Sequence, residues 1–446
     1  MIKKGLILNL IKTIFLNENN KDNIESIYKK SYFENNSIDE VEEKVREIIA
    51  RIKGEGDKAL LEFTKKFDKT DLKPAEILVK PEEFEIARQE VDKELMETIK
   101  EAIKRIKKYH LHQKENSWFT PNEKGVILGQ ILNPIERVGL YIPGGTAAYP
   151  STLMMSAVPA MIAGVKEIAV VNPPSSKGKI NSYVLATAEE LGLSEIYKIG
   201  GAQAIAALAY GTETVKKVDK IVGPGNTYVT LAKKNVFGIV DIDMLAGPSE
   251  ILIWADEKAN PRYIACDLLS QAEHDREATA ILITNSVFLA KMVKEEIELQ
   301  LKKIDRKEII QASLKKQGKL IVAENNKIII DFINCFAPEH LELQIDDPWQ
   351  KLGEIKNAGA IFIGAFSPEP LGDYWAGPNH ILPTSGGARN FSPLSVSEFV
   401  KKSSIICYDQ ERLKKSGKKI ASLARLEGLE AHARSIEIRY KEDQNI

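Results

Sequence analysis

A helical pattern of hydrophobic and polar positions runs through the N-terminal part of the chain. Apolar side chains recur every three or four residues, at Ile38, Val41, Val45, Ile48, Ile49 and Ile52. This spacing predicts one face of a helix that begins at Ser37, where Glu40 would complete a capping box. Residues 54–57 contain two glycines and interrupt the pattern. A second helix is predicted over residues 59–66, and a charged amphipathic helical region over residues 81–110.

After about residue 125 the pattern changes to short apolar segments that alternate with helical stretches. The segments predicted as strands are Ile168–Val171, Ile196–Ile199, Lys220–Val222, Ile251–Trp254, Ala280–Ile283, Leu320–Val322 and Ala360–Ile363. Such alternation is typical of parallel sheets covered by helices. One sheet does not need so many strands. The predicted fold class is therefore α/β, with two Rossmann-like parallel-sheet domains, an N-terminal arm and a small helical C-terminal piece.

The pattern divides the chain into four expected parts. Residues 1–30 are an arm that is too small to bury its own apolar patch, so we expect it to dock elsewhere, for example on a second subunit. Residues 31–140 together with residues 250–396 are expected to form a first, discontinuous α/β domain, and residues 141–249 a second one. Residues 397–446 are the C-terminal piece, in which a predicted helix over 411–427 ends before Gly428. The arm's apolar patch consists of Ile7, Leu8, Leu10, Ile11, Ile14 and Phe15.

Composition and charge narrow the class of protein. The 446 residues include 62 basic and 63 acidic side chains, a net charge of −1, which argues against a nucleic-acid surface. Three widely spaced cysteines argue against a disulfide framework and favour a reducing compartment, the cytoplasm. Lys12 interrupts the N-terminal apolar run, so a cleaved signal peptide is not expected. No apolar run reaches the roughly 20 residues of a membrane span.

Glycine-containing turns follow three of the short apolar segments. They are Tyr141–Thr146, Ile199–Gln203 and Val222–Asn226. Glycine lets backbone amides approach a phosphate closely, and a following helix N-terminus favours the negative charge. No turn contains the G-x-G-x-x-G fingerprint of dinucleotide-binding domains, and each turn alone is as well explained by glycine's role in tight turns. Together they are compatible with a phosphate-bearing ligand.

The six histidines divide into two groups. His110 and His112 lie in a charged helical segment, and we expect them to be solvated. Gln271 and His274 stand three apart on the predicted helix 262–275, so they project from one side of it. An amide oxygen and an imidazole nitrogen could bind one ion there. An ordinary polar helix end is the simpler explanation of this pair alone, because glutamine is an uncommon zinc ligand.

Three further segments place histidine near acidic groups. Pro338 ends a predicted helix, so Glu339 and His340 are expected on a constrained turn, as two groups suited to proton transfer. Alternatively, they are a capping glutamate and a surface histidine. Asp373 and His380 belong to an irregular stretch, residues 372–380, which fits either a ligand-binding loop or a packed surface loop. Two histidines, an aspartate and an amide would suit Zn²⁺, and also Mn²⁺ or Co²⁺. The third segment, which alone fits an ordinary helix terminus, contains Glu427 and His432.

Taken in order, these motifs resemble the histidinol dehydrogenase family. The resemblance runs from about Val41 to His432 and includes most of the segments described above. It rests on residues 55–60, 67–68, 141–145, 200–204, 223–226, 246–250, 270–275, 337–341, 372–374, 377–380 and 427–432. Each motif is weak alone, and their order along the chain makes the match specific.

The resemblance implies roles for individual residues. One zinc ion would be held by Gln271, His274, Asp373 and His432, with His432 reaching the site from the partner in an intertwined homodimer. The C-terminal piece would then be a dimer-exchange domain, with Glu427 also supplied across the interface. The substrate pocket would be lined by the four zinc ligands together with Ser249, His340, His380 and Glu427. NAD would contact Tyr141, Gln203 and Asn226.

The resemblance also implies a reaction, the final steps of histidine biosynthesis. L-histidinol would be oxidised to L-histidine through a bound aldehyde, with two NAD⁺. His340 would take the hydroxyl proton, and Glu339 would activate water for the second step. Two positions depart from the family pattern: Ser156 stands where asparagine is common, and the bulky Trp375, which we expect to pack, lies beside a ligand. The competing hypotheses are a relative that oxidises another alcohol, a zinc hydrolase without a nucleotide, and a non-catalytic binding protein.

Overall fold

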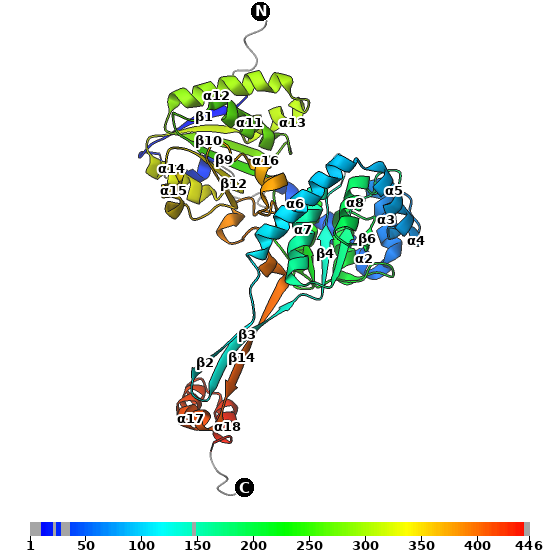
Figure 1. Cartoon of the computed structure of the whole chain (residues 1–446), viewed down its shortest axis with the longest axis vertical. Coiled ribbons are helices and arrows are strands. Elements are labelled where there is room, and N and C mark those ends of the chain that lie inside the picture. Colours follow the sequence, from blue (N-terminus) through cyan, green and yellow to red (C-terminus); the bar gives the residue numbers. More distant parts are fainter. Residues whose placement is uncertain (1–9, 21–23, 28–35, 145–148, 441–446) are drawn as a thin grey trace, which may run out of the picture.

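A computed structural model describes residues 10–20, 24–27, 36–144 and 149–440 of the chain. Figure 1 shows two α/β lobes, from which a slender extension leads to a small helical pair near the C-terminus. Each lobe is built on a parallel sheet, which confirms the predicted fold class. No helix in the described part of the chain combines the length and apolar character needed to cross a membrane.

The first lobe contains a six-stranded parallel sheet of order β1-β11-β10-β9-β12-β13. Successive side chains of its central strand β9 (Glu250–Ala255) point to opposite faces. One face packs against α11, α12 and α13, and the other against α1 and α14. The other strands are β1 (Lys12–Leu16), β10 (Thr279–Thr284), β11 (Lys319–Ala323), β12 (His340–Gln344) and β13 (Ala360–Ile363). The helices are α1 (Ile24–Ile27), α11 (Pro261–Ala272), α12 (Val287–Gln300), α13 (Lys307–Lys316), α14 (Asn326–Phe336), α15 (Pro348–Lys351) and α16 (Glu369–Leu371).

Part of the N-terminal arm completes this sheet. Strand β1 pairs in parallel with β11, from Lys12 beside Lys319 to Leu16 beside Ala323. Ile11 and Leu16 are buried in the sheet's two cores. Leu10 and Ile11 of the arm's apolar patch therefore dock on their own chain, whereas Phe15 is exposed. Ile7 and Leu8 of the predicted patch lie outside the described residues.

The second lobe contains a five-stranded parallel sheet of order β6-β5-β4-β7-β8. Helices α2, α3, α5 and α6 pack in the two hydrophobic cores of this sheet. The sequence pattern had instead predicted that residues 31–140 pack with residues 250–396. An amphipathic pattern shows which face of a helix is buried and not which sheet covers it; the exact domain boundaries stay a prediction. The strands are β4 (Arg137–Tyr141), β5 (Glu167–Val171), β6 (Ile196–Tyr197), β7 (Lys220–Val222) and β8 (Asp241–Ile242). The helices are α2 (Asn36–Glu55), α3 (Asp57–Asp68), α4 (Pro74–Ile77), α5 (Pro81–Glu90), α6 (Lys93–Leu111), α7 (Pro150–Ala163), α8 (Ser182–Glu190), α9 (Gly201–Tyr210) and α10 (Thr227–Val236).

The extension is a three-stranded antiparallel ribbon of order β14-β3-β2 (Figure 1). Its strands are β2 (Trp118–Glu123), β3 (Val126–Pro134) and β14 (Val400–Tyr408), and its tip carries α17 (Gln410–Leu426) and α18 (Glu430–Glu437). The C-terminal piece is therefore not purely helical, because it begins with a nine-residue strand. Most of β14 is exposed and has no apolar stripe, so its extended form depends on pairing with β3. Short helical turns complete the fold at Leu301–Lys303, Leu352–Glu354, Gly372–Ala376 (η5), Gly387–Arg389 and Val396–Phe399.

Candidate active site

The candidate site lies where the ends of the two sheets meet. Tyr141 and Val222 end β4 and β7, which sit side by side where the strand order of the five-stranded sheet reverses. This is the place at which parallel sheets open a ligand crevice. The six-stranded sheet contributes its amino ends instead, because Glu250 and His340 are the first residues of β9 and β12. A cavity of about 350 Å³ joins the two edges. Its lining includes Pro143, Tyr149, Asn226, Ser249, Gln271, His274, Glu339, His340, Glu369, Asp373, Tyr374 and His380.

The Gly223 turn is held tightly against the neighbouring strand. Gly223 has a φ of +119°, and a Cβ there would lie 2.2 Å from the Tyr141 carbonyl oxygen, so only glycine fits. A buried ion pair between Lys233 and Asp243 supports the turn from below. Asp243 Oδ2 accepts a 2.8 Å hydrogen bond from the Gly223 N–H, and Lys233 Nζ donates a 3.0 Å bond to the Gly223 carbonyl.

The three residues expected to contact NAD all lie at the carboxyl edge of the five-stranded sheet. The Tyr141 hydroxyl accepts a 3.1 Å hydrogen bond from Gly201 N–H, and burial raises its pKa to about 12. Gln203, in the first turn of α9, donates a 3.5 Å bond to Asp68, whose pKa burial raises to about 6. Asn226 caps α10 through a 3.2 Å bond from Val229 N–H and lines the cavity. Gly145 and Thr146 of the first predicted turn lie outside the described residues.

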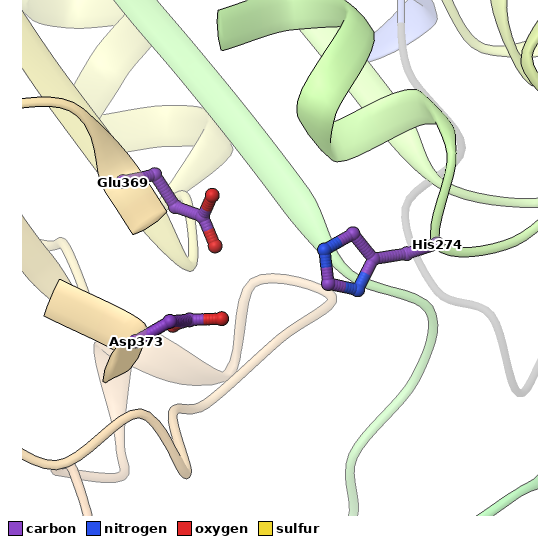
Figure 2. A group of neighbouring side chains, drawn as sticks. All are labelled: His274, Glu369 and Asp373. Atoms are coloured by element: carbon purple, nitrogen blue, oxygen red, sulfur yellow. The ribbon is translucent and has the colours of Figure 1, made fainter. Parts of the chain in front are cut away.

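Three of the four expected metal ligands meet at this cavity. Gln271 is fully buried, and neither its amide oxygen nor its amide nitrogen has a hydrogen-bond partner among the residues that the structure describes. His274, Glu369 and Asp373 each offer one ligand atom, and these atoms lie within 4.8 Å of one another. Figure 2 shows the three side chains pointing toward one another from separate segments. An orphaned buried amide beside a nitrogen and oxygen donor set fits a metal ion such as Zn²⁺.

Glu369 belongs to this site, and the sequence analysis missed it. Burial raises its pKa to about 9, and the neighbouring Asp373 carboxylate contributes through its charge and a hydrogen bond. The two acids are four residues apart, on α16 and on the π-helical turn η5, so they lie on the same side. Pro368 is the N-cap residue of α16. A helix predicted to begin after this proline would have placed Glu369 and Asp373 one turn apart.

The main chain of Glu250 fixes the imidazole of His340. The Glu250 carbonyl oxygen lies 2.9 Å from His340 Nδ1, so Nδ1 must carry the proton that it donates there. His340 Nε2 is buried, has no hydrogen-bond partner in the described part of the chain and is left as the acceptor. Burial lowers the pKa of His340 to about 4, which keeps the ring neutral. The imidazole of His340 lines the cavity, and its Nε2 can act as a base. His340 was expected on a turn but is the first residue of strand β12.

Glu339 is placed beside this base by the same main chain. Glu339 Oε2 accepts a 2.8 Å hydrogen bond from Glu250 N–H. Burial raises the pKa of Glu339 well above its ordinary range, and the carboxylates of Glu250, Asp373 and Glu369 raise it further. Burial also raises the pKa of Glu250, to about 8. The site therefore concentrates acids that can hold protons near neutral pH next to a neutral imidazole.

Ser249 and His380 also line the cavity. Ser249 lies in the turn before β9, and His380 Nδ1 lies 3.2 Å from the carbonyl oxygen of Asp373. Burial lowers the pKa of His380. Tyr149 and Tyr374 also lie on the cavity wall, and no sequence motif indicated them, because their positions depend on tertiary packing.

Glu427 and His432 do not join the cavity within one chain. Glu427 follows the last residue of α17 and His432 lies within α18, and both are exposed. Figure 1 shows these two helices at the tip of the extension. A separate expectation about histidine was wrong: His110 is fully buried, and its Nδ1 lies 2.7 Å from Gln113 Oε1. The wrong expectation arose because most neighbouring residues in the sequence are charged, whereas His110 lies on the buried face of α6.

The two departures from the family pattern lie outside the cavity lining. Ser156 is buried in α7, and its hydroxyl has no hydrogen-bond partner. Trp375 packs against the core of the second lobe, with the Arg105 guanidinium 4.4 Å from its ring centroid. The expectation that Trp375 packs is therefore confirmed.

Comparison with known proteins gives a consistent match. A family model described as histidinol dehydrogenase matches residues 33–440. Histidinol dehydrogenase of Halalkalibacterium halodurans is 54% identical over 400 residues, covering 90% of this chain and 94% of that protein. Histidinol dehydrogenase of Bacillus subtilis is 52% identical over 401 residues, covering 90% and 93%. The crystal structure of histidinol dehydrogenase from Elizabethkingia anophelis has a TM-score of 0.91 and 39% identity, covering 97% of this chain and 98% of that one.

Proposed function

The chain belongs to the histidinol dehydrogenase family, and we propose that it oxidises L-histidinol to L-histidine with one zinc ion per subunit and two NAD⁺. The observation that carries this proposal is the common cavity. His340 lines the same cavity as His274 and Asp373, which offer metal-ligand atoms. Its Nε2 has no hydrogen-bond partner among the described residues. A base and a metal-binding set in one cavity suit the oxidation of an alcohol that also binds the metal.

Zinc would be held by Gln271, His274 and Asp373, with His432 supplied by a second subunit. Gln271 supports this assignment because its buried amide has no hydrogen-bond partner among the described residues. His432 supports it differently: it is exposed at the end of an extension that leads away from its own chain's cavity (Figure 1). A homodimer in which each extension reaches the other subunit would bring Glu427 and His432 to the site together.

NAD would bind at the carboxyl edge of the five-stranded sheet, near Tyr141, Gln203 and Asn226. The glycine turns at this edge keep side chains away from the backbone amides. Asn226 also lines the cavity, so a nucleotide at this edge would lie beside the substrate space. Bound zinc would act as a Lewis acid toward the substrate, and NAD⁺ would accept a hydride in each of the two steps.

The chain's own residues would handle the protons. In the first step, His340 Nε2 would take the hydroxyl proton as the alcohol loses a hydride and becomes the aldehyde. In the second step, Glu339 would take a proton from the water that adds to the aldehyde, and the hydrate would lose a second hydride to give the carboxylic acid. Ser249 and His380 would orient the substrate inside the cavity. Burial of the site would keep the reactive aldehyde away from bulk water.

Stoichiometry tests the proposal. Purified protein is mixed with L-histidinol and excess NAD⁺, and NADH is counted at completion, with and without a chelator. Two NADH per histidinol, lost on chelation and restored by zinc, is the expected result. Zinc binding without turnover of histidinol would favour a relative that oxidises another alcohol, and failure to bind NAD would favour a zinc hydrolase. The small, odd number and wide spacing of the cysteines accord with the further proposal that the enzyme works in the reducing cytoplasm.

A further inference from the structure

Behind the cavity lies a buried pair of carboxyl groups that the proposed reaction does not use. Glu342 is 1% exposed and Asp267 is 8% exposed. Neither residue lines the cavity of the candidate site. Within the described ranges, no cation contributes to the pKa shift of either carboxyl group. Burying two acids without a cation is costly, and an apolar pair of similar volume would serve stability at least as well.

The pair is tied together by Gln344. Its amide nitrogen donates a 2.9 Å hydrogen bond to Glu342 Oε2 and a 3.1 Å bond to Asp267 Oδ2. The two carboxyl groups therefore lie against the same amide nitrogen. Two buried carboxylates this close together repel each other unless one of them holds a proton. Burial and the charge of Asp267 raise the pKa of Glu342, which identifies Glu342 as the protonated partner.

The pair also reaches a third element. Glu342 Oε1 accepts a 3.0 Å hydrogen bond from the backbone N–H of Glu369, the first residue of α16. Strand residues two apart share a face, so Glu342 lies on the same side of β12 as His340. Asp267 lies one turn before Gln271 on α11, so these two side chains share a helix face. The pair thus joins three parts of the site. Gln271 lies on α11, His340 on β12, and Glu369 and Asp373 on α16 and η5.

We propose that Glu342 and Asp267 are positioning residues that clamp α16 and η5 against α11, so that Glu369 and Asp373 stand beside Gln271 and His274. This inference rests on the proposed function, because three of the positioned groups, Gln271, His274 and Asp373, are those assigned to the metal, and Glu369 lies beside them. Groups that orient metal ligands through hydrogen bonds tune metal affinity even though they do not touch the metal. The clamp acts through the Glu369 main chain, so it needs an acceptor oxygen at position 342 rather than a charge.

The test compares Glu342→Leu with Glu342→Gln in the full-length protein. Zinc affinity is measured by competition with a chromophoric chelator, and ligand geometry by the visible absorption of the cobalt-substituted protein. Glu342→Leu removes the acceptor and is expected to weaken zinc binding about 10- to 100-fold and to change the cobalt spectrum. Glu342→Gln keeps an acceptor oxygen and is expected to bind zinc within about threefold of the wild type.

Ser313→Ala is the matched control. Ser313 is fully buried in the same lobe and donates a 2.8 Å hydrogen bond to the Ala278 carbonyl, so its loss costs stability without touching the clamp. Its zinc affinity and cobalt spectrum are expected to match the wild type at a lower melting temperature. If Glu342→Leu does not fold, Asp267→Ala makes the same comparison from α11, with an expected loss of about 10-fold.

A folded Glu342→Leu or Asp267→Ala protein with wild-type zinc affinity and an unchanged cobalt spectrum would overturn the clamp. Loss of zinc affinity in Ser313→Ala of the same size as in Glu342→Leu would also overturn it, since general destabilisation would then explain the effect. Absence of zinc binding by the wild-type protein would instead refute the proposed function, so the two failures are distinguishable.

Discussion

The carbonyl oxygen of Glu250 lies 2.9 Å from Nδ1 of His340, and this contact decides which imidazole nitrogen can act as a base. Because Nδ1 must donate to the carbonyl, Nε2 keeps its lone pair. The N–H of the same residue holds Glu339 at 2.8 Å, so one residue orients both proposed proton carriers. A main-chain contact of this kind persists when side chains change, which makes the geometry robust to substitution nearby.

Replacing His340 should separate catalysis from metal binding. His340→Asn removes the Nε2 base while keeping a side chain that can donate toward the Glu250 carbonyl. We expect kcat to fall about 10²- to 10⁴-fold, with zinc content close to that of the wild type. Steady-state kinetics and metal analysis of the same preparation measure the two quantities. Wild-type kcat in this variant would remove His340 from the proton-transfer role.

Glu339→Gln should affect the second oxidation more than the first. The amide keeps an oxygen for the Glu250 N–H but cannot take a proton from water. A single-turnover experiment with excess NAD⁺ should show a first NADH formed at near wild-type rate and a second formed about 10²-fold or more slowly. Equal slowing of both phases would mean that Glu339 acts in both steps or only structurally.

The pH dependence should follow the lowered pKa of His340. Its pKa of about 4 means that the neutral, proton-accepting form is present at neutral pH and is lost only as the pH falls through about 4. An ordinary histidine would instead lose this form near pH 6.5. The acidic limb of the first hydride transfer, which does not use Glu339, should therefore lie well below pH 6.5. A limb with an apparent pKa of 6.5 or above, seen with zinc saturating at every pH, would contradict a desolvated His340.

Mixing two inactive variants tests whether His432 acts across subunits. His340→Asn and His432→Ala chains are unfolded together and refolded to allow exchange. A mixed dimer would contain one site in which both residues are wild-type, so random pairing should restore about a quarter of wild-type activity. Each variant refolded alone serves as the control and should remain inactive. No recovery in mixed dimers, verified by differential tags, would place His432 in its own chain's site or outside any site.

Breaking the buried pair under the Gly223 turn should cost stability and cofactor binding. Lys233 and Asp243 have side chains 3% and 1% exposed, so Lys233→Met leaves an uncompensated buried carboxylate. We expect the free energy of unfolding to fall by about 3–5 kcal/mol in urea titrations, with weaker NAD⁺ binding because the turn loses its support. Lys65→Met is the control, because its pair with Asp71 is 63% and 73% exposed, and it should change little. Equal effects from both variants would refute the structural role of the buried pair.

Local pattern was sufficient to predict much of the fold. Ala360–Ile363 forms strand β13 with the predicted bounds, and Glu167–Val171 differs from its prediction by one residue. Such strands are short apolar runs bounded by turns, and this local pattern is enough to predict a strand of a parallel sheet. Strand β14 was missed because its side chains are mostly exposed, so only its partner β3 determines its conformation. Strand β12 (His340–Gln344) was missed because His340, Glu342 and Gln344 are polar, although every residue of the strand is buried.

The sequence by itself determined the α/β class, the resemblance to a family and the residue types able to bind a metal, because these depend on local periodicity and on the order of motifs. Only the tertiary structure decided that helices α2 to α6 cover the five-stranded sheet and that Glu369 joins His274 and Asp373. It alone gave His340 its tautomer, through the Glu250 carbonyl. The physical reason is that these features depend on contacts between segments far apart in the chain, and periodicity along one segment carries no information about which distant segment it meets.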